Sequence, residues 1–186
     1  MIRFFPTIGA IQKFTSELNL HKDSLKCMHC TQSDQWVSHG FIYKYISSTQ
    51  PEKVGKRIFC SNRCQHRGCG RTFQLYLSTE IPSFRLAAAS RLFVFISALI
   101  TLLSVKEAYR KVAGQEYPRN AWRWINRLMR RLSNFRSVVS HRSQPSDRTF
   151  NSRSRRLQIL LPTLQQLFSL DTDCANYQLI HQDSFI

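Results

Sequence analysis

Residues 60–73 read CSNRCQHRGCGRTF, and this stretch holds three of the six cysteines in the chain. A further pair stands at 27–30, in CMHC, where two residues separate the cysteines. That spacing lets both thiolates bind one metal ion from a tight turn, and a second cysteine group further along can complete a tetrahedral site. The pattern therefore predicts a small ribbon of short strands, at residues 27–81, that is held by a metal ion.

The expected ligands are four cysteines: Cys27, Cys30, Cys60 and Cys69, with Cys64 as the alternative to Cys60. Cys69 is followed by Gly70, which suits a knuckle whose backbone turns back with its amides facing sulfur. Cys60 is preferred over Cys64 because it ends the strand-like residues 57–59. Four thiolates leave no open position on the metal, so we expect one structural Zn²⁺ that activates no water.

Other candidate ligands are weaker. His29, His39 and His66 lie nearby, but an isolated histidine in a basic protein is more often a surface residue. Cys174 lies far along the chain and is expected to be an ordinary buried cysteine. Residues 1–10 do not resemble a signal peptide, and clustered cysteines without an export signal favour metal over disulfides. We therefore expect a cytoplasmic, nucleoid-associated protein.

The charge is high and unevenly placed. The 186 residues carry a formal net charge of +16, with a pI near 10.3. Residues 104–156 hold 14 basic and 3 acidic side chains, whereas residues 157–186 hold no basic and 3 acidic ones. The first segment is expected to face the phosphates of double-stranded DNA, and the second to contact protein.

Helical patterns fill most of the second half. Pro82 opens an expected helix at 82–103, whose uncharged part is too short for the roughly 20 apolar residues of a membrane span, so no membrane partner is expected. Ser104 and Glu107 form a capping-box pattern that starts a second helix, and Gly114 can end it. Pro118 suits the first position of a third helix, at 118–132.

The helix at 118–132 is expected to have two faces. Trp122, Ile125, Met129 and Leu132 lie at helical spacing and predict a core side. The opposite side is expected to contact DNA through seven residues: Arg119, Asn120, Arg123, Asn126, Arg127, Arg130 and Arg131. A short helix, a turn with glycine and a second helix bearing arginines is typical of a helix-turn-helix, here at 104–132.

The sequence therefore predicts an α+β protein: a small cysteine zinc ribbon of short strands, an all-α helix-turn-helix bundle and a C-terminal helix. Strands are expected at 40–46, 57–59 and 72–77, with a loop at 47–55, and a short helix at 15–20. The expected segments are 1–26, the ribbon at 27–81, the helical domain at 82–140, a basic linker at 141–154 and a C-terminal helix and acidic tail at 155–186. The C-terminal helix, at 155–168, has an apolar stripe and contains Pro162, which should kink or shorten it.

The order of these parts resembles a known family. A CxxC pair, the segment 57–60 that ends in an aromatic residue and a cysteine, the knuckle at 69–73 and a helix-turn-helix are similar to the amino-terminal DNA-binding module of bacterial insertion-sequence transposases and InsA-type regulators. The family usually has two residues between its last two ligands, whereas eight separate Cys60 from Cys69 and four separate Cys64 from Cys69. The resemblance covers roughly residues 25–135 and implies a DNA-binding role in a mobile element.

An enzyme is not expected. Acidic residues are too sparse for a carboxylate recombinase, and no phosphate loop, nucleophile elbow or HExxH helix is present, so no catalytic residue is proposed. The favoured function is an accessory or regulatory DNA-binding protein of a mobile element. The alternatives are an adaptor that recruits a larger transposase or recombinase through the C-terminal helix, and an RNA-binding zinc protein. A homodimer is a further expectation.

Overall fold

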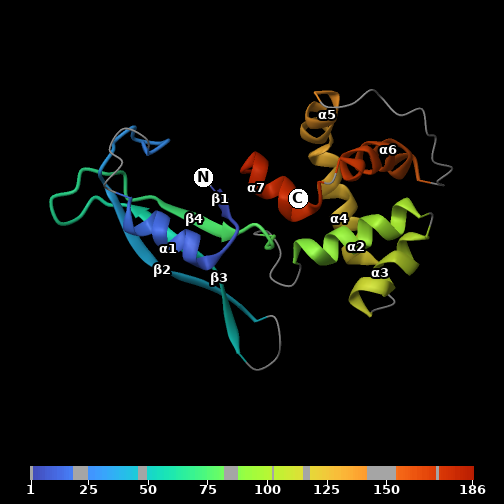
Figure 1. The fold of residues 1–186 in the computed structure, drawn as a ribbon, viewed down its shortest axis with the longest axis horizontal. Coiled ribbons are helices and arrows are strands. Elements are labelled where there is room, and N and C mark those ends of the chain that lie inside the picture. Colours follow the sequence, from blue (N-terminus) through green and yellow to red (C-terminus); the bar gives the residue numbers. More distant parts are fainter. Residues whose placement is uncertain are drawn as a thin grey trace. The chain divides into compact units, whose positions relative to one another are not determined.

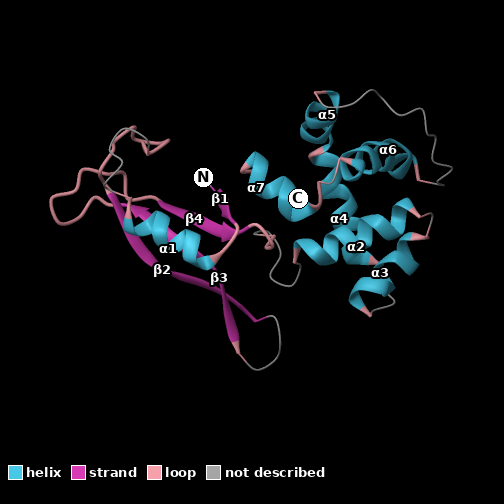
Figure 2. Cartoon of the chain, in the orientation of Figure 1, coloured by secondary structure: helices cyan, strands magenta, loops and turns pink. Residues whose placement is uncertain are grey.

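The computed structural model describes residues 2–18, 25–45, 50–81, 88–101, 103–114, 118–141, 154–170 and 172–186. It is an α+β structure, as expected from the sequence, with two compact units (Figure 1). The sheet unit comprises Met1–Leu86 and Gln178–Ser184, and the helical unit comprises Ala87–Tyr177 and Phe185–Ile186. Strands and helices are segregated between these units except for α1 (Ile8–Ser16) and part of α7 (Cys174–His181) (Figure 2).

The sheet unit is built on four strands in the order β1-β4-β3-β2. The strands are β1 (Ile2–Phe5), β2 (Trp36–Tyr45), β3 (Pro51–Cys60) and β4 (Thr72–Leu77). β1 pairs with β4 in parallel, and the other neighbours are antiparallel. The expected strand at 72–77 is confirmed, whereas β3 begins at Pro51 inside the stretch expected to be a loop. β1 is absent from the sequence expectation.

α1 (Ile8–Ser16) lies over one face of this sheet (Figure 1). The same face carries the larger apolar core. α1 begins after Thr7, whose side-chain oxygen accepts a hydrogen bond from the Ala10 N–H, so it starts earlier than the helix expected at 15–20. The core of this face consists of Ile11, Leu18, Leu25, Cys27, Trp36, Ile58, Cys60, Phe73 and Leu75. Two cysteines of the expected metal site therefore belong to the apolar core itself.

The opposite face of the sheet has a second, smaller core of Phe4, Ile42, Val54 and Tyr76. Two glutamine side chains from the C-terminal part of the sheet unit form hydrogen bonds with the backbone of the rest of that unit. Gln178 donates to the Ser78 and Glu80 carbonyl oxygens, at 2.6 and 2.8 Å. Gln182 both accepts from the Phe4 N–H and donates to the Phe4 oxygen, at 2.9 Å each, so it satisfies one residue of the edge strand β1.

The helical unit begins with three helices that share an aromatic core. They are α2 (Ala89–Ile100), α3 (Val105–Ala113) and α4 (Arg119–Arg130). The rings of Phe95, Tyr109 and Trp124, one from each helix, pack edge to face with centroids 5.2 to 6.4 Å apart. α2 ends three residues before the limit expected from the sequence, and its expected start at residues 82–87 lies outside the described residues.

The core side of α4 differs from the sequence interpretation. The buried side chains are Ala121, Trp124, Ile125 and Leu128. Placing Trp122 on the core side was wrong, because 36% of its surface is exposed. Residues two positions apart lie about 200° apart round a helix, so the two tryptophans of the WRW segment point to different sides. Trp124 is the one that completes the aromatic core.

Two further helices do not follow from the sequence patterns. α5 (Leu132–Ser140) is separated from α4 by Arg131 alone, and α7 (Cys174–His181) lies in the expected acidic tail. The rings of Phe135, Tyr177 and Phe185 contact one another at 4.8 to 5.4 Å and bury the C-terminal end of the chain in the helical unit. Cys174 is fully buried, as expected.

The last long helix, α6 (Arg155–Ser169), runs through Pro162 and is not shortened by it. Its apolar stripe is buried within the helical unit through Leu157, Leu160, Leu161, Leu164 and Leu167. A partner bound along α6, as the sequence suggested, would find this stripe already covered by the chain itself. Among the described helices, none is both long and apolar enough to cross a bilayer.

Candidate metal centre and candidate nucleic-acid interface

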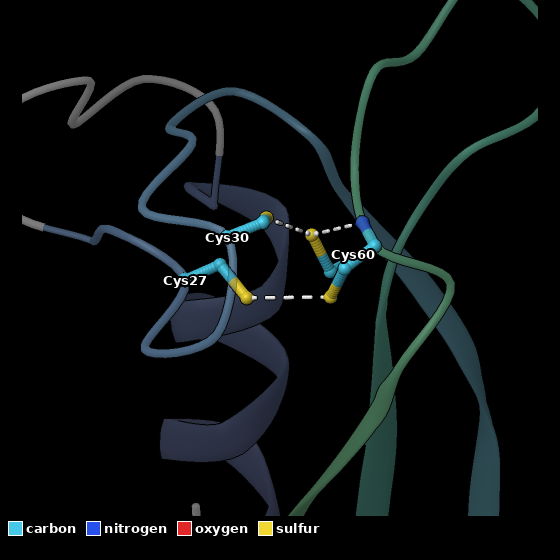
Figure 3. A group of neighbouring side chains, drawn as sticks. Cys27, Cys30 and Cys60 are labelled. Atoms are coloured by element: carbon cyan, nitrogen blue, oxygen red, sulfur yellow. Dashed lines mark hydrogen bonds between the residues drawn. The ribbon is translucent and has the colours of Figure 1, made fainter.

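The sheet unit brings four cysteine sulfurs together. The Sγ atoms of Cys27, Cys30, Cys60 and Cys69 all lie within 4.8 Å of one another. Cys27 and Cys69 are 3.6 Å apart, and so are Cys30 and Cys60. Figure 3 shows Cys27 and Cys30 pointing from their loop towards Cys60 at the end of β3. This group could hold a metal ion.

The distances match a tetrahedral thiolate site. Zinc–sulfur bonds of about 2.3 Å place the corners of a tetrahedron about 3.8 Å apart. The two measured sulfur–sulfur distances are close to that edge, and the longest separation is at most 4.8 Å. Cys27 and Cys60 are buried and Cys30 and Cys69 are half-buried, so the group lies at the edge of the core.

The first two cysteines sit on a tight turn. The Thr31 N–H donates to the Cys27 carbonyl at 2.8 Å, and the Cys27 N–H donates to the Gln32 carbonyl at 3.0 Å. Thr31 has a φ of 59°, in the left-handed region that closes such turns. The preceding segment is anchored because the indole N–H of Trp36 donates to the Leu25 carbonyl at 2.8 Å.

The residues between Cys60 and Cys69 form a loop whose two ends lie next to each other. The Gly68 N–H donates to the Ser61 carbonyl at 2.6 Å, so the residues between them form a closed excursion. The Gly70 N–H donates to the Cys60 carbonyl, and the Cys69 N–H points at the Cys60 sulfur at 3.4 Å. Cys60 and Cys69 are therefore held side by side despite the eight residues between them.

Two glycines make this knuckle sterically feasible. Gly70, the glycine singled out in the sequence, has a φ of +74°, which favours a residue without a side chain. Gly68, which the sequence reasoning did not single out, has no space for a Cβ atom. Such an atom would lie 2.6 Å from the Cys60 sulfur and even closer to the Ser61 carbonyl oxygen. Gly68 is thus required for packing against a candidate ligand.

The alternative ligands lie elsewhere. Cys64 is exposed within the 61–68 loop and does not join the four sulfurs. Among the described residues, none of the histidines belongs to this metal-ligating group. The His29 ring stays close to Arg71, whose guanidinium lies 2.7 Å from Nδ1, and desolvation and this cation lower the pKa of His29.

The pKa values of the cysteine thiols indicate that a group of four thiolates would need a nearby positive charge. Burial raises the pKa of Cys60 to about 12 and also raises that of Cys69. Burial acts in the same direction on Cys27, but hydrogen bonds from the Cys30 and His29 N–H groups and neighbouring thiols bring its pKa down to about 7. Four thiolates so close together would repel one another, and a bound dication removes that penalty.

Exposed cations flank the cysteines in the sequence. Lys26, Arg63, Arg67 and Arg71 all lie on the two segments that supply the sulfurs, and all four are exposed. A dication with four thiolate ligands has a net charge of −2, which such cations offset. The donor set and its surroundings therefore fit a tetrathiolate metal centre.

The second candidate site is the solvent side of α4. Arg119, Asn120, Arg123 and Arg130 are exposed there, and α4 contains no acidic residue. Of the other expected DNA contacts, Asn126, Arg127 and Arg131 are half-buried. The Asn126 side-chain oxygen accepts a hydrogen bond from Arg156 of α6, which adds a cation that the sequence reasoning had not assigned to this surface.

The two ends of α3 are well defined. The Ser104 hydroxyl accepts from the Glu107 N–H, and the Glu107 carboxylate accepts from the Ser104 N–H, so the expected capping box is present. These hydrogen bonds lower the pKa of Glu107. Gly114 ends α3 with a φ of 64°, as expected. Residues 115–117, between α3 and α4, lie outside the described residues.

Comparisons with protein-family models, curated proteins and solved structures find no match to this chain.

Proposed function

We propose that this chain is a zinc-stabilised DNA-binding protein, in which the cysteine cluster holds one Zn²⁺ and the exposed side of α4 contacts double-stranded DNA. The observation that carries the DNA part is the concentration of arginine on one side of α4. Arg119, Arg123 and Arg130 are exposed on a helix whose other side is fixed in an aromatic core. An arginine-bearing helix on a rigid support is the arrangement of a recognition helix.

Zinc is the metal that this donor set favours. Four thiolates at tetrahedral spacing suit Zn²⁺, whereas Mg²⁺ and Ca²⁺ prefer oxygen ligands. Zinc in such a site stabilises the fold and, with no open coordination position, does not activate water. Cys27, Cys30, Cys60 and Cys69 would hold the ion, and Gly68 and Gly70 let the backbone approach them.

The zinc proposal is tested by elemental analysis of the purified chain. We expect one zinc per chain, and its loss in Cys27→Ser and in Cys69→Ser. Cys64→Ser is the matched control, because Cys64 lies in the same region but is exposed and outside the cluster. Retention of full zinc by both ligand variants, or loss of zinc in the control alone, would refute the assignment.

The arginines of α4 are expected to make two kinds of contact, with base edges and with phosphates. Arg119 and Arg123 lie in the first turns, where a recognition helix meets base edges, and arginine reads guanine through paired hydrogen bonds. Arg130 lies near the end of α4 and is placed better for phosphates. Arg156 supplies a further cation beside Asn126.

The DNA proposal is tested by selecting genomic fragments with the purified chain and footprinting those it retains. The double variant Arg119→Ala/Arg123→Ala should lose the footprint. Arg136→Ala is the matched control, since Arg136 is an exposed arginine of the neighbouring helix α5. Preferential binding of duplex RNA in the same assay, or an unchanged footprint in the double variant, would contradict the proposal.

Within this function, we place the protein with accessory or regulatory proteins of mobile elements. That assignment rests on the order of the cysteine ribbon and the two-helix motif along the chain. No observation favours the adaptor alternative, because the apolar stripe of α6 is buried.

A further inference from the structure

The β2–β3 hairpin carries a cluster of two aromatic rings and two lysines on the face of the sheet that bears α1. The members of this cluster, which we name the hairpin platform, are Phe41, Tyr43, Lys53 and Lys56. The Lys53 and Lys56 ammonium nitrogens lie 4.5 and 5.1 Å from the Phe41 ring centroid. The rings of Phe41 and Tyr43 meet edge to face, with centroids 6.4 Å apart.

The platform exists because the β2–β3 pairing is irregular. Phe41 is paired with Lys56 and Tyr43 with Lys53, so one residue separates the aromatic pair but two separate the lysines. In a regular strand, residues three positions apart point to opposite faces. The register shift between Ile42 and Tyr43 inserts one extra residue on β3 and thereby turns both lysines towards the same ring.

Gly55 helps to hold this irregular stretch. It is buried, and a Cβ atom there would collide with the Leu75 carbonyl oxygen of β4. The neighbouring Val54 is also buried, on the smaller core. Bulges that re-aim side chains are common next to functional sites, and this one joins two cations to two aromatic rings.

The charge of the platform is not neutralised locally. Glu52 is the one acid of β2 and β3, and its pairing with Lys44 places it on the other face, where Lys44 binds Glu80 at 2.8 Å. Lys56 donates to the Thr15 hydroxyl, a neutral partner, at 3.0 Å. Among the described residues, neither platform lysine forms an ion pair with a carboxylate.

Tyr43 is available to a ligand. Half of its surface (50%) is exposed, so its ring can be reached from solvent. Tyr43 meets Phe41 edge to face, and the two lysine ammonium groups lie over the Phe41 ring. A planar group can therefore stack on Tyr43 while a flexible anionic chain passes the lysines.

We propose that the hairpin platform binds single-stranded nucleic acid, with a base stacked on Tyr43 and phosphates beside Lys53 and Lys56. An unpaired base offers the flat face that such stacking needs, and the sugar–phosphate chain supplies the complementary charge. The bases of an intact duplex are stacked on one another and offer no free face. This site is separate from α4 and does not depend on the proposed duplex contact.

The test measures binding of the full, metal-loaded chain to a labelled short oligothymidylate, its RNA counterpart and a duplex of the same length. Tyr43→Ala should weaken single-strand binding about tenfold, because each stacked base contributes roughly 1–3 kcal/mol. Tyr43→Phe, which keeps the ring, should bind like the original chain. Lys53→Gln/Lys56→Gln should make the salt dependence shallower by about 0.7 units for each phosphate that the lysines no longer neutralise.

Two results would overturn the inference. Unchanged oligothymidylate and RNA affinity in Tyr43→Ala, with metal content and circular dichroism also unchanged, would show that no base stacks there. Equal binding of a polyglutamate peptide that ignores Tyr43 would make the surface a general anion contact. Failure here is distinct from failure of α4, because Arg119→Ala/Arg123→Ala should lower duplex binding while leaving oligothymidylate binding at the platform.

Discussion

The two units of this chain reach stability by different routes. In the sheet unit, the larger core includes Cys27 and Cys60, so the candidate metal ligands and the apolar packing share side chains. In the helical unit, three helices meet through the rings of Phe95, Tyr109 and Trp124, with no candidate metal ligands among them. A small mixed sheet with long loops buries little surface by itself, and a metal ion bound by the four cysteines would offset that shortage.

The two candidate binding surfaces also differ in the backbone structure that presents their side chains. α4 presents arginines from a regular helix, where the spacing of 3.6 residues per turn decides which side chains share a side. The hairpin platform depends instead on an irregular strand pairing, which departs from the simple alternation of a strand. The first kind of surface is readable from sequence and the second is not.

Metal removal should produce the largest difference between the units. Structural zinc contributes on the order of 10 kcal/mol in small domains. A strong chelator should therefore leave the backbone amides of β2, β3 and β4 open to hydrogen exchange, while amides of α2, α3 and α4 stay protected. Hydrogen exchange followed by mass spectrometry makes this measurement on the intact chain. Equal loss of protection in both units would contradict the comparison.

The next largest effect is expected in the helical unit, from substitution of Trp124 compared with substitution of Trp122. Trp124→Ala removes a buried ring and should cost about 3–5 kcal/mol of unfolding free energy. Trp122→Ala, two residues away, removes a partly exposed ring and should cost under about 1 kcal/mol. Denaturant unfolding followed by circular dichroism compares the two variants. Similar costs for both would mean that α4 does not pack on the side described.

Gly68 gives a smaller test of the knuckle. Gly68→Ala forces a Cβ atom against the Cys60 sulfur, and such overpacking typically costs about 1–3 kcal/mol. Weaker zinc retention in a competition with a chromogenic chelator should accompany it. Gly9→Ala is the matched control, since its Cβ would make only an ordinary contact 3.8 Å from the Thr7 hydroxyl and it lies in α1. Normal zinc retention by Gly68→Ala would show that the knuckle relaxes freely.

The four-cysteine cluster was largely predictable from the sequence because its signals are local. The CxxC turn, the strand that ends at Cys60 and the glycine after Cys69 each follow from a few neighbouring residues. Gly68 was missed because its constraint comes from Cys60 and Ser61 returning across a closed loop, eight residues back. A glycine directly before a ligand is the one local sign that could have pointed to it.

The features of the fold that the sequence analysis missed also depend on contacts between residues far apart in the chain. Parallel pairing joins β1 to β4, about seventy residues later, and no local pattern encodes that contact. In α4, two apolar registers share Ile125, and only the tertiary contact of Trp124 with Phe95 decides between them. The stripe of α6 was visible, but whether a stripe serves the chain or a partner depends on what the rest of the chain provides.

The salt dependence of DNA binding by single arginine variants of α4 tests the central claim most directly. Arg123→Ala should cost about 1–3 kcal/mol on a selected DNA site and little on random DNA. Arg130→Ala should weaken both alike and make the salt slope shallower by about one unit, while Arg136→Ala should change neither. If Arg123→Ala and Arg130→Ala in folded chains both bind DNA like the original, with the same salt slope, α4 is not the DNA-contacting helix.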